Sequence, residues 1–241
     1  MLETFGLQDK VIFVTGGNHG IGAAIVEILN KLGARVAYTY RSEPGPDAVL
    51  TIKADVKDPA AMEDAIARTE AEVGPIYGVV LNAGITRDNL FTNISAADWY
   101  DVIDTNLNGI FNTLRPIVPT LYERGTGALV FISSVVGEQG NIGQANYAAA
   151  KSAVIGLAKT LGLEGARYGV RANVVAPGFT STDMAKAIPD KVKDRILARI
   201  PLRRFAEPEE IAWAVAFLMS PTLAGYITGD VLSVNGGQYT A

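Results

Sequence analysis

The sequence predicts an α/β fold in which a doubly wound parallel sheet of about seven strands carries helices on both faces. Three observations favour it. Short, continuously apolar runs suited to buried parallel strands alternate with segments of helical periodicity. A glycine-rich turn directly follows the first of these runs. The 241 residues contain no Pro/Ser-rich or charged linker and 49% of them are hydrophobic, so we expect one domain over residues 1–241.

Six apolar runs are clear strand candidates, at 11–15, 35–39, 76–81, 128–133, 171–176 and 231–234, and a weaker one lies at 49–54. Helix start signals lie between them. Asp58 before Pro59 predicts a capped helix start, and Ser95 with Asp98 resembles a capping box. Pro208 opens a further helix. Helices thus begin where strands end, as in a Rossmann fold.

Composition excludes several classes of function. The net charge of −4 and the isoelectric point near 5.1, without a long basic run, argue against nucleic acid or a membrane as the main partner. Small molecules are the expected ligands. The chain has no cysteine, which fits a reducing compartment, and no metal site is expected. The first ten residues do not resemble a signal peptide, and apolar runs such as 211–219 are too short to span a bilayer, so we expect a cytoplasmic protein.

The turn after the first strand reads TGGNHGIG, from Thr15 to Gly22, and leads into a helix. Glycines let a backbone approach a pyrophosphate closely, and the N–H groups at a helix N-terminus favour negative charge. Gly16, Gly20 and Gly22 would be the critical positions. The spacing differs from the commoner G-x-G-x-x-G, and glycines alone could mark only a tight turn. The position between strand and helix favours phosphate binding.

Tyr147 and Lys151 are four positions apart, which on one helix puts the phenol and the ammonium on the same face. A tyrosine ordinarily has a pKa of about 10, and each unit of lowering needs roughly 1.4 kcal/mol of preference for the ionised form. A nearby lysine can supply that preference. The pair could also be two exposed neighbours, yet among nine tyrosines only Tyr147 has such a partner. Together with Ser134 and Asn106, the pair resembles the proton-delivery machinery of a carbonyl reductase.

These motifs occur in the order found in the short-chain dehydrogenase/reductase family, which the chain resembles over essentially its full length. The matching segments are Thr15 to Gly22, Asn82-Ala83-Gly84 after the fourth strand, Asn106 in DTNLNG, Ser134 at the end of the fifth strand, Tyr147 with Lys151, and Pro177-Gly178 after the sixth. Each residue alone has a structural explanation, as a cap, a strand end or a solvated charge. Their joint order favours the catalytic one.

The resemblance implies a reaction in which a hydride passes from nicotinamide to a carbonyl carbon while Tyr147 donates a proton to the oxygen. It implies that Ser134 orients that oxygen. Lys151 would lower the pKa of Tyr147 and hold the nicotinamide ribose, and Asn106 would support a water molecule that links the lysine to solvent. Ser133 would be structural.

The resemblance also implies the residues that bind the cofactor. They are Gly16, Asn18, His19, Gly20, Ile21, Gly22, Arg41, Asp55, Val56, Asn82, Ala83, Gly84, Tyr147, Lys151, Pro177, Gly178, Thr180 and Thr182. Tyr40 stands where an acidic residue would favour NAD, and Arg41 could grip the 2′-phosphate of NADP, so NADPH is expected. Arg41 could equally be a solvated loop charge, and His19 could be a surface residue. The connection 42–53 leaves little room for a helix between the second and third strands.

Four segments resemble reductases of 3-oxoacyl thioesters, whose substrates are carried on CoA or on acyl carrier protein. They are 82–91, 133–151, 176–184 and 226–237. The resemblance implies a substrate site of Asp88, Ser134, Asn141, Gln144, Tyr147, Gly178 and Phe179, although Asp88, Asn141 and Gln144 could be turn residues. A dehydrogenase of another secondary alcohol and a catalytically silent NADP-binding protein stay as alternatives.

A charged segment around 178–204 is expected to form a flap over the substrate. Its cations are Lys186, Lys191, Lys193, Arg195, Arg199, Arg203 and Arg204. They could meet an acidic carrier protein or the phosphates of CoA, but most would be a solvated helical face. The family resemblance further implies a homotetramer.

Overall fold

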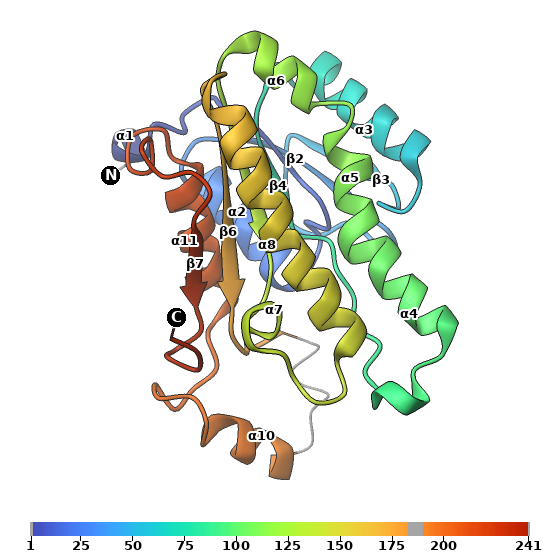
Figure 1. Ribbon diagram of the computed structural model, residues 1–241. Coiled ribbons are helices and arrows are strands. Elements are labelled where there is room, and N and C mark those ends of the chain that lie inside the picture. The colour runs from blue at the N-terminus through green and yellow to red at the C-terminus, as the bar shows by residue number, and fades with distance from the viewer. Residues whose placement is uncertain (1, 183–189, 241) are drawn as a thin grey trace.

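A computed structural model describes residues 2–182 and 190–240 of the chain (Figure 1). Its centre is a seven-stranded parallel sheet in the order β3-β2-β1-β4-β5-β6-β7. The strands are β1 Val11–Val14, β2 Arg35–Tyr40, β3 Leu50–Lys53, β4 Ile76–Leu81, β5 Gly127–Ile132, β6 Val170–Pro177 and β7 Val231–Val234. Each predicted strand is confirmed to within one or two residues at its ends, because buried parallel strands are marked by unbroken apolar runs.

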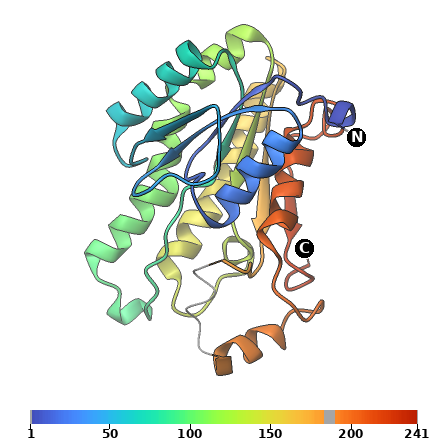
Figure 2. The same cartoon turned by 180° about the vertical axis from the view of Figure 1, so that it is seen from behind.

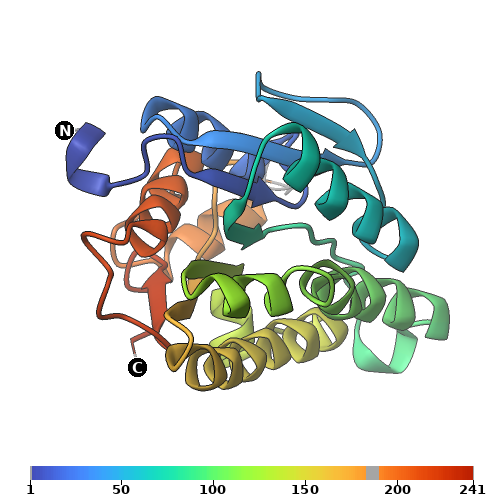
Figure 3. The same cartoon turned by 90° about the horizontal axis from the view of Figure 1, so that it is seen from above.

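Helices cover both faces of the sheet, as the two views in Figures 2 and 3 make clear. Their bounds are α1 Leu2–Phe5, α2 Gly20–Lys31, α3 Pro59–Glu72, α4 Ala96–Ile103, α5 Gly109–Leu114, α6 Val118–Arg124, α7 Val135–Gln139, α8 Ala145–Ala166, α10 Asp190–Leu197 and α11 Pro208–Met219. A 3₁₀ turn, η1, spans Phe91–Asn93, and a π-helical turn, η2, spans Asp104–Asn108 between α4 and α5. This is the doubly wound arrangement that the sequence predicts.

Two hydrophobic clusters, one on each side of the sheet, form the core. One joins α2 and α11 to side chains such as Ile12, Val14 and Val130. The other joins α3, α5 and α8 to the alternate strand positions, including Phe13 and Phe131. Because side chains alternate along a strand, one run of apolar residues supplies both clusters. The sheet is therefore buried on both faces, and its carboxyl edge is left for polar residues.

The strand order reverses at β1, which lies between β2 and β4. In a doubly wound sheet the connections on either side of such a point leave in opposite directions, which opens a crevice at the carboxyl ends of the strands. The residues after β1, β4, β5 and β6 therefore converge on one edge of the sheet.

Helix starts agree with the sequence in most places. Asp58 caps α3, and the connection from β2 to β3 contains no helix, as its length predicts. The capping box at Ser95 is only half formed: its Oγ accepts the Asp98 N–H at 3.0 Å, but the Asp98 carboxylate receives the Ser95 hydroxyl rather than its backbone N–H. A complete box instead opens α11, between Glu207 and Glu210. The sequence analysis did not identify that cap.

Part of the expected flap lies outside the described residues. Residues 183–189, which include Lys186, are not described, and neither is the side chain of Lys191. The described part comprises α10 and the segment after it, and its base is held by the Ala206 N–H, which donates to the Phe179 carbonyl at 2.9 Å.

We predict that Asp58→Ala lowers the free energy of unfolding by about 1 kcal/mol, because the Asp58 carboxylate accepts the N–H groups of Ala60 and Ala61 at 2.9 and 3.2 Å. Denaturation in urea measures it. The matched control is Asp64→Ala in the same helix, an exposed position that does not cap it. Equal losses in the two variants would contradict the capping role.

Candidate active site

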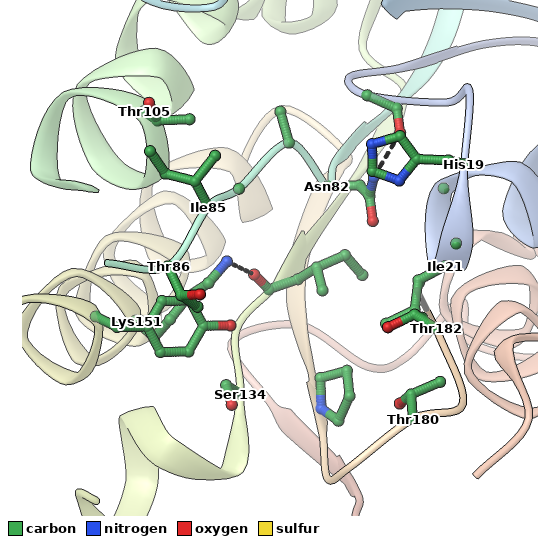
Figure 4. Close-up of a pocket in the computed structure, with 18 of the residues that line it drawn as sticks. His19, Ile21, Asn82, Ile85, Thr86, Thr105, Ser134, Lys151, Thr180 and Thr182 are labelled. Carbon is green, nitrogen blue, oxygen red and sulfur yellow. Dashed lines mark hydrogen bonds between the residues drawn. The ribbon is translucent and has the colours of Figure 1, made fainter. Parts of the chain in front are cut away.

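A cleft of about 570 Å³ lies at the carboxyl edge of β1, β4, β5 and β6. Figure 4 shows its two sides: His19, Ile21, Thr180 and Thr182 lie around one end, and Lys151, Thr86 and Ser134 lie around the other. The cleft is large enough for a ligand of cofactor size. It brings together most of the residues that the sequence singled out.

The glycine-rich turn forms the floor at one end of the cleft. Gly16 and Gly20 have φ angles of +65° and +54°, a conformation that L side chains rarely adopt. At Gly22 a Cβ atom would collide with the Gly16 carbonyl oxygen. The turn therefore requires glycine at these three positions, and its backbone is open to close approach by a ligand.

Asn82 and Thr15 tie this turn to the end of β4. The Asn82 amide donates to the carbonyls of Thr15 and Gly16 at 3.1 and 2.9 Å. In return, the Thr15 hydroxyl accepts the backbone N–H groups of Asn82 and Ala83 at 3.0 and 3.1 Å. These bonds hold the start of α2 in a fixed place at the crevice.

The start of α2 suits an anionic group. The first N–H groups of a helix have no partner within it, and the helix dipole places partial positive charge there. His19, the N-cap, is exposed and makes no capping bond through its side chain. A dinucleotide pyrophosphate fits this combination of a glycine cradle without side chains and unused backbone donors.

The end of β2 contributes a second wall, made by Thr39, Tyr40 and Arg41 with Asp55 and Val56 from the loop after β3. Arg41 is exposed, and within the described part of the chain its guanidinium has no ion-pair partner. It is placed to meet an anionic group on a ligand in the cleft.

Tyr147 and Lys151 lie one turn apart on α8, and both line the cleft. The Lys151 Nζ lies 5.7 Å from the centroid of the Tyr147 ring and donates to the Ile132 carbonyl at 2.7 Å. Ser134, the N-cap of α7, faces the same space, and its Oγ accepts the Val136 N–H at 3.1 Å. Its hydroxyl acts on the Tyr147 phenol and lowers the pKa of that group.

Ser133 has a different environment from Ser134. Its buried hydroxyl donates to the Lys151 carbonyl at 2.8 Å and so ties β5 to α8. This contact is the structural one expected of the first serine in the pair.

Burial controls the ionisation of the tyrosine and the lysine. It raises the pKa of Tyr147 to about 12, with a smaller lowering by the Ser134 hydrogen bond and a smaller raising by the Asp88 charge. Burial also lowers the pKa of Lys151 to about 8. The sequence led us to expect a lowered pKa at Tyr147. In the protein without ligands the pKa is raised instead, because removal of the phenol from water outweighs the lowering by Ser134.

Asn106 lies behind the wall of the cleft and is completely buried. Its amide donates to the Ile85 carbonyl at 2.9 Å and its carbonyl oxygen accepts the Ile85 N–H at 2.8 Å. Both ends of the side chain are therefore engaged in holding the loop after β4. The side chain itself is not among the groups that line the cleft.

Thr105, beside it in the π-helical turn, does line the cleft, and its buried Oγ1 has no hydrogen-bond partner among the described residues. A buried hydroxyl without a partner calls for an explanation, and a bound ligand would supply one.

A chain of amides and a carboxylate borders the mouth of the cleft. The Asn141 amide donates to the Gln144 carbonyl oxygen, and the Gln144 amide donates to the Asp88 carboxylate, each at 2.9 Å. Asp88 and Gln144 line the cleft, whereas Asn141 lines a second cavity next to it. Phe179 lines both. The expected substrate residues are thus divided between two adjoining spaces.

The remaining expected residues also border the cleft. They are Asn18, Gly84, Pro177, Gly178, Thr180 and Thr182. The sequence analysis missed other lining residues, namely Thr39, Tyr40, Ala54, Ile85, Thr86, Thr105, Ile132, Val135 and Val136 as binding positions. All are within a few positions of a residue that was named. A place at or just after the carboxyl end of a strand is the signal that could have found most of them, whereas Thr105 lies in the π-helical turn.

Two absences complete the description. Over residues 2–182 and 190–240, no group of three or more His, Asp or Glu side chains could hold a metal ion. In the same part of the chain, every helix is too short or too polar to cross a membrane.

Comparison with known proteins gives the family. A family model of short-chain dehydrogenases, described as Enoyl-(Acyl carrier protein) reductase, matches residues 16–239. The chain is 52% identical over 238 residues to an acetoacetyl-CoA reductase of Synechocystis sp. (strain ATCC 27184 / PCC 6803 / Kazusa), covering 98% of this chain and 99% of the relative. The chain belongs to the short-chain dehydrogenase/reductase family.

Two further relatives of this short-chain dehydrogenase/reductase, each 44% identical to it, are named for different carriers. An acetoacetyl-CoA reductase of Rhizobium meliloti (strain 1021) is 44% identical, covering 97% of this chain and 100% of the relative. A 3-oxoacyl-[acyl-carrier-protein] reductase of Escherichia coli (strain K12) is also 44% identical, covering 96% of this chain and 98% of the relative. The protein is therefore an oxidoreductase that acts on carbonyl and alcohol groups, and reductases of this type use NADH or NADPH.

We predict that the buried Lys151 makes stability depend on pH. In the unfolded chain the lysine keeps its ordinary pKa of 10.5, whereas in the fold it is about 8, so above about pH 8 the unfolded state binds more protons. The free energy of unfolding of the wild type, measured in urea relative to Lys151→Met, should therefore rise with pH from about 8 to 9.5. The full effect over the window up to 10.5 is at most about 3 kcal/mol.

Tyr147→Phe is the control for this measurement, since it should keep the same pH dependence in that range. Tyr147 itself acts only at higher pH and with the opposite sign, because its raised pKa lets the fold hold a proton that the unfolded chain loses. A difference between wild type and Lys151→Met that does not change with pH would contradict the burial of an ionisable lysine.

Proposed function

We propose that the protein is an NADPH-dependent reductase that converts 3-oxoacyl thioesters to 3-hydroxyacyl thioesters. The observation that carries this proposal is the convergence of Ser134, Tyr147 and Lys151 on one side of a cleft whose other end is the glycine cradle. The names of the relatives, which include acetoacetyl-CoA and 3-oxoacyl-[acyl-carrier-protein] reductases, supply the substrate class.

The catalytic roles are assigned as follows. A reduced nicotinamide, when bound, supplies a hydride to the ketone carbon. Tyr147 donates its proton to the ketone oxygen, and the Ser134 hydroxyl holds that oxygen by a hydrogen bond. A phenol with a raised pKa keeps its proton at neutral pH, so it is available for donation. In alcohol oxidation the same residue acts as the base.

Lys151 stabilises the phenolate that Tyr147 becomes. With a pKa of about 8, its ammonium is mostly charged at neutral pH, and it lies near the ring. Its attraction for a new negative charge is strong because the surroundings exclude water. Asn106 does not line the cleft and acts by fixing the loop at Ile85. We also propose that it supports a water molecule that links Lys151 to solvent.

The proposed cofactor site consists of the turn from Gly16 to Gly22 with Asn18, His19, Gly20 and Ile21, the walls at Arg41, Asp55, Val56, Asn82, Ala83 and Gly84, and the residues Tyr147, Lys151, Pro177, Gly178, Thr180 and Thr182. We propose NADPH rather than NADH because Arg41 stands near the end of β2 without an ion-pair partner in the described chain, and β2 has no carboxylate there to bind ribose hydroxyls.

The proposed thioester site contains Asp88, Ser134, Asn141, Gln144, Tyr147, Gly178 and Phe179. We favour acetoacetyl-CoA over an acyl-carrier substrate, which the 52% identity to an acetoacetyl-CoA reductase supports. The segment 178–204 is proposed as a flap over the substrate in a single domain. A cytoplasmic homotetramer is also proposed, supported by exposed large apolar side chains such as Phe111, Leu163 and Tyr226.

Loss of absorbance at the NADPH band after addition of acetoacetyl-CoA tests the proposed function. We expect oxidation of NADPH with acetoacetyl-CoA and little with crotonyl-CoA, which carries a carbon–carbon double bond in place of the ketone. Tyr147→Phe should lower kcat by about 10²–10⁴-fold while NADPH binding, followed by fluorescence, is retained. The phenylalanine keeps the ring but cannot donate a proton.

Three outcomes would overturn parts of this assignment. Preference for crotonyl-CoA would favour the chemistry that the description of the family model names. NADPH binding without oxidation by any thioester would favour another secondary alcohol or a silent binding protein. A Tyr147→Phe variant with most of its activity would remove the proton-donating role.

Arg41→Ala should raise the KM for NADPH by about tenfold, since an exposed charge pair is worth up to about 1 kcal/mol and a bidentate one somewhat more, and should leave the KM for NADH unchanged. The matched control is Arg35→Ala, an exposed arginine at the other end of β2. Equal changes for both coenzymes would remove Arg41 from the phosphate site.

A further inference from the structure

A second cavity, of about 810 Å³, adjoins the cleft. It is lined by Gln139, Gly140, Asn141, Ile142, Phe179, Arg195, Ile196, Arg199 and Gln238. These residues come from the loop after α7, the region of α10, and the turn after β7. Figure 1 shows α10 below the carboxyl edge of the sheet, on the side where the loop between α7 and α8 projects. Since Phe179 lines both spaces, a ligand that extends out of the cleft can continue into this cavity.

The four arginines between 195 and 204 differ in what their side chains do. Arg203 donates to the Ala198 carbonyl at 2.9 Å, which caps the end of α10. Arg204 forms an ion pair with Glu210, with Nη2 2.6 Å from Oε1. Arg195 and Arg199, which line the cavity, have neither an ion-pair partner nor a side-chain hydrogen bond among the described residues.

Arg195 lies in the last turn of α10 and Arg199 lies two residues beyond its end, and both line the same cavity. Both are exposed, which means that a ligand can reach them. A guanidinium offers a planar fork of donors that matches a phosphate group. Two such forks on the wall of one cavity suit a ligand with adjacent phosphate groups.

The rest of the lining is apolar or amide-bearing. Ile142 is 87% exposed, unusual for so large an apolar side chain, and Phe179 continues the apolar surface toward the cleft. Gln238 has a side-chain oxygen with no hydrogen-bond partner in the described chain. Asn141 connects the cavity, through Gln144, to Asp88 in the cleft.

The arginine, apolar and amide-bearing surfaces of this cavity together match one kind of molecule. The pantetheine arm of an acyl thioester has apolar methylenes and methyl groups, two amides, and phosphate at the end far from the thioester. Its amide N–H groups can donate a hydrogen bond to the side-chain oxygen of Gln238, which has no partner among the described residues. In CoA the arm ends in a diphosphate, whereas on a carrier protein it ends in one phosphodiester attached to the protein.

We propose, on the basis of the proposed function, that the second cavity binds the pantetheine and diphosphate of a CoA thioester, with Arg195 and Arg199 contacting the diphosphate. The 52% identity to an acetoacetyl-CoA reductase agrees with a CoA substrate, whereas at 44% a CoA reductase and a carrier-protein reductase are equally similar. Two uncommitted arginines for two phosphate groups favour CoA. These residues set the KM for the carrier, and they take no part in the chemistry at Tyr147.

The test compares three thioesters of acetoacetate: the CoA ester, the carrier-protein ester, and the N-acetylcysteamine ester, which has no phosphate. In Arg195→Ala/Arg199→Ala we expect the KM for acetoacetyl-CoA to rise by about tenfold or more, for the loss of two exposed charge contacts. Kinetics with the phosphate-free ester should change by less than about twofold. Added salt should raise the KM of the wild type for the CoA ester toward that of the variant. It should not do so for the other two esters.

The control variant is Arg35→Ala/Arg115→Ala, which removes the same charge from exposed arginines that line neither cavity. It should leave the KM for acetoacetyl-CoA unchanged. Calorimetric binding of CoA itself gives a readout that does not depend on turnover, and the Arg195→Ala/Arg199→Ala variant should bind CoA about tenfold more weakly.

The outcomes separate this inference from the proposed function. Reduction of no thioester would refute the proposed function, whereas calorimetry would still decide whether the arginines bind CoA. Equal losses with all three esters would show a general effect on the fold and overturn the inference. A loss confined to the carrier-protein ester would assign the arginines to the carrier and overturn the choice of CoA. An unchanged KM for the CoA ester would overturn it directly.

Discussion

The attachment of α8 to the end of β5 is the constraint on which the rest of the site depends. Lys151 donates its buried ammonium to the Ile132 carbonyl, and Ser133 donates its hydroxyl to the Lys151 carbonyl, so strand and helix are joined in both directions. Gly137 allows α7 to lie against the Lys151 backbone, where a Cβ atom would come within 2.8 Å. Since Ser134 follows β5 directly, these contacts fix the distance between serine and tyrosine before any ligand binds, which is the preorganisation that catalysis needs.

The same attachment carries an energetic cost that is tied to function. An ammonium in a buried site loses hydration, and burial lowers the pKa of Lys151 to about 8 for that reason. The hydrogen bond to Ile132 offsets part of this loss. A stable apo site therefore holds a neutral phenol and an incompletely solvated cation. In the proposed mechanism, proton transfer from Tyr147 creates a negative charge beside this cation, so the arrangement suits the state after proton donation better than the resting protein.

Much of the fold and the main residues of the cleft follow from the sequence because each is a local constraint. Apolar runs of strand length fix the sheet, and Gly16, Gly20 and Gly22 are required by backbone geometry at one turn. Properties that depend on distant segments could not be predicted in this way. The raised pKa of Tyr147 depends on how completely the packed chain covers the phenol. The engagement of Asn106 with Ile85 depends on a π-helical turn that meets a loop from another strand.

The second cavity could not be predicted from the sequence either, because its walls come from three distant segments, near 140, 195–199 and 238. The sequence identifies a charged flap, but only the three-dimensional contacts separate Arg203 and Arg204, which hold the fold together, from Arg195 and Arg199. The proposed catalytic side chains lie at the end of β5 and on α8, whereas the arginines lie on the segment that joins β6 to α11. With the roles proposed above, carrier preference can change through a few exposed residues while the proton-transfer geometry stays intact. This division gives a physical reason why relatives of equal similarity bear names with different carriers.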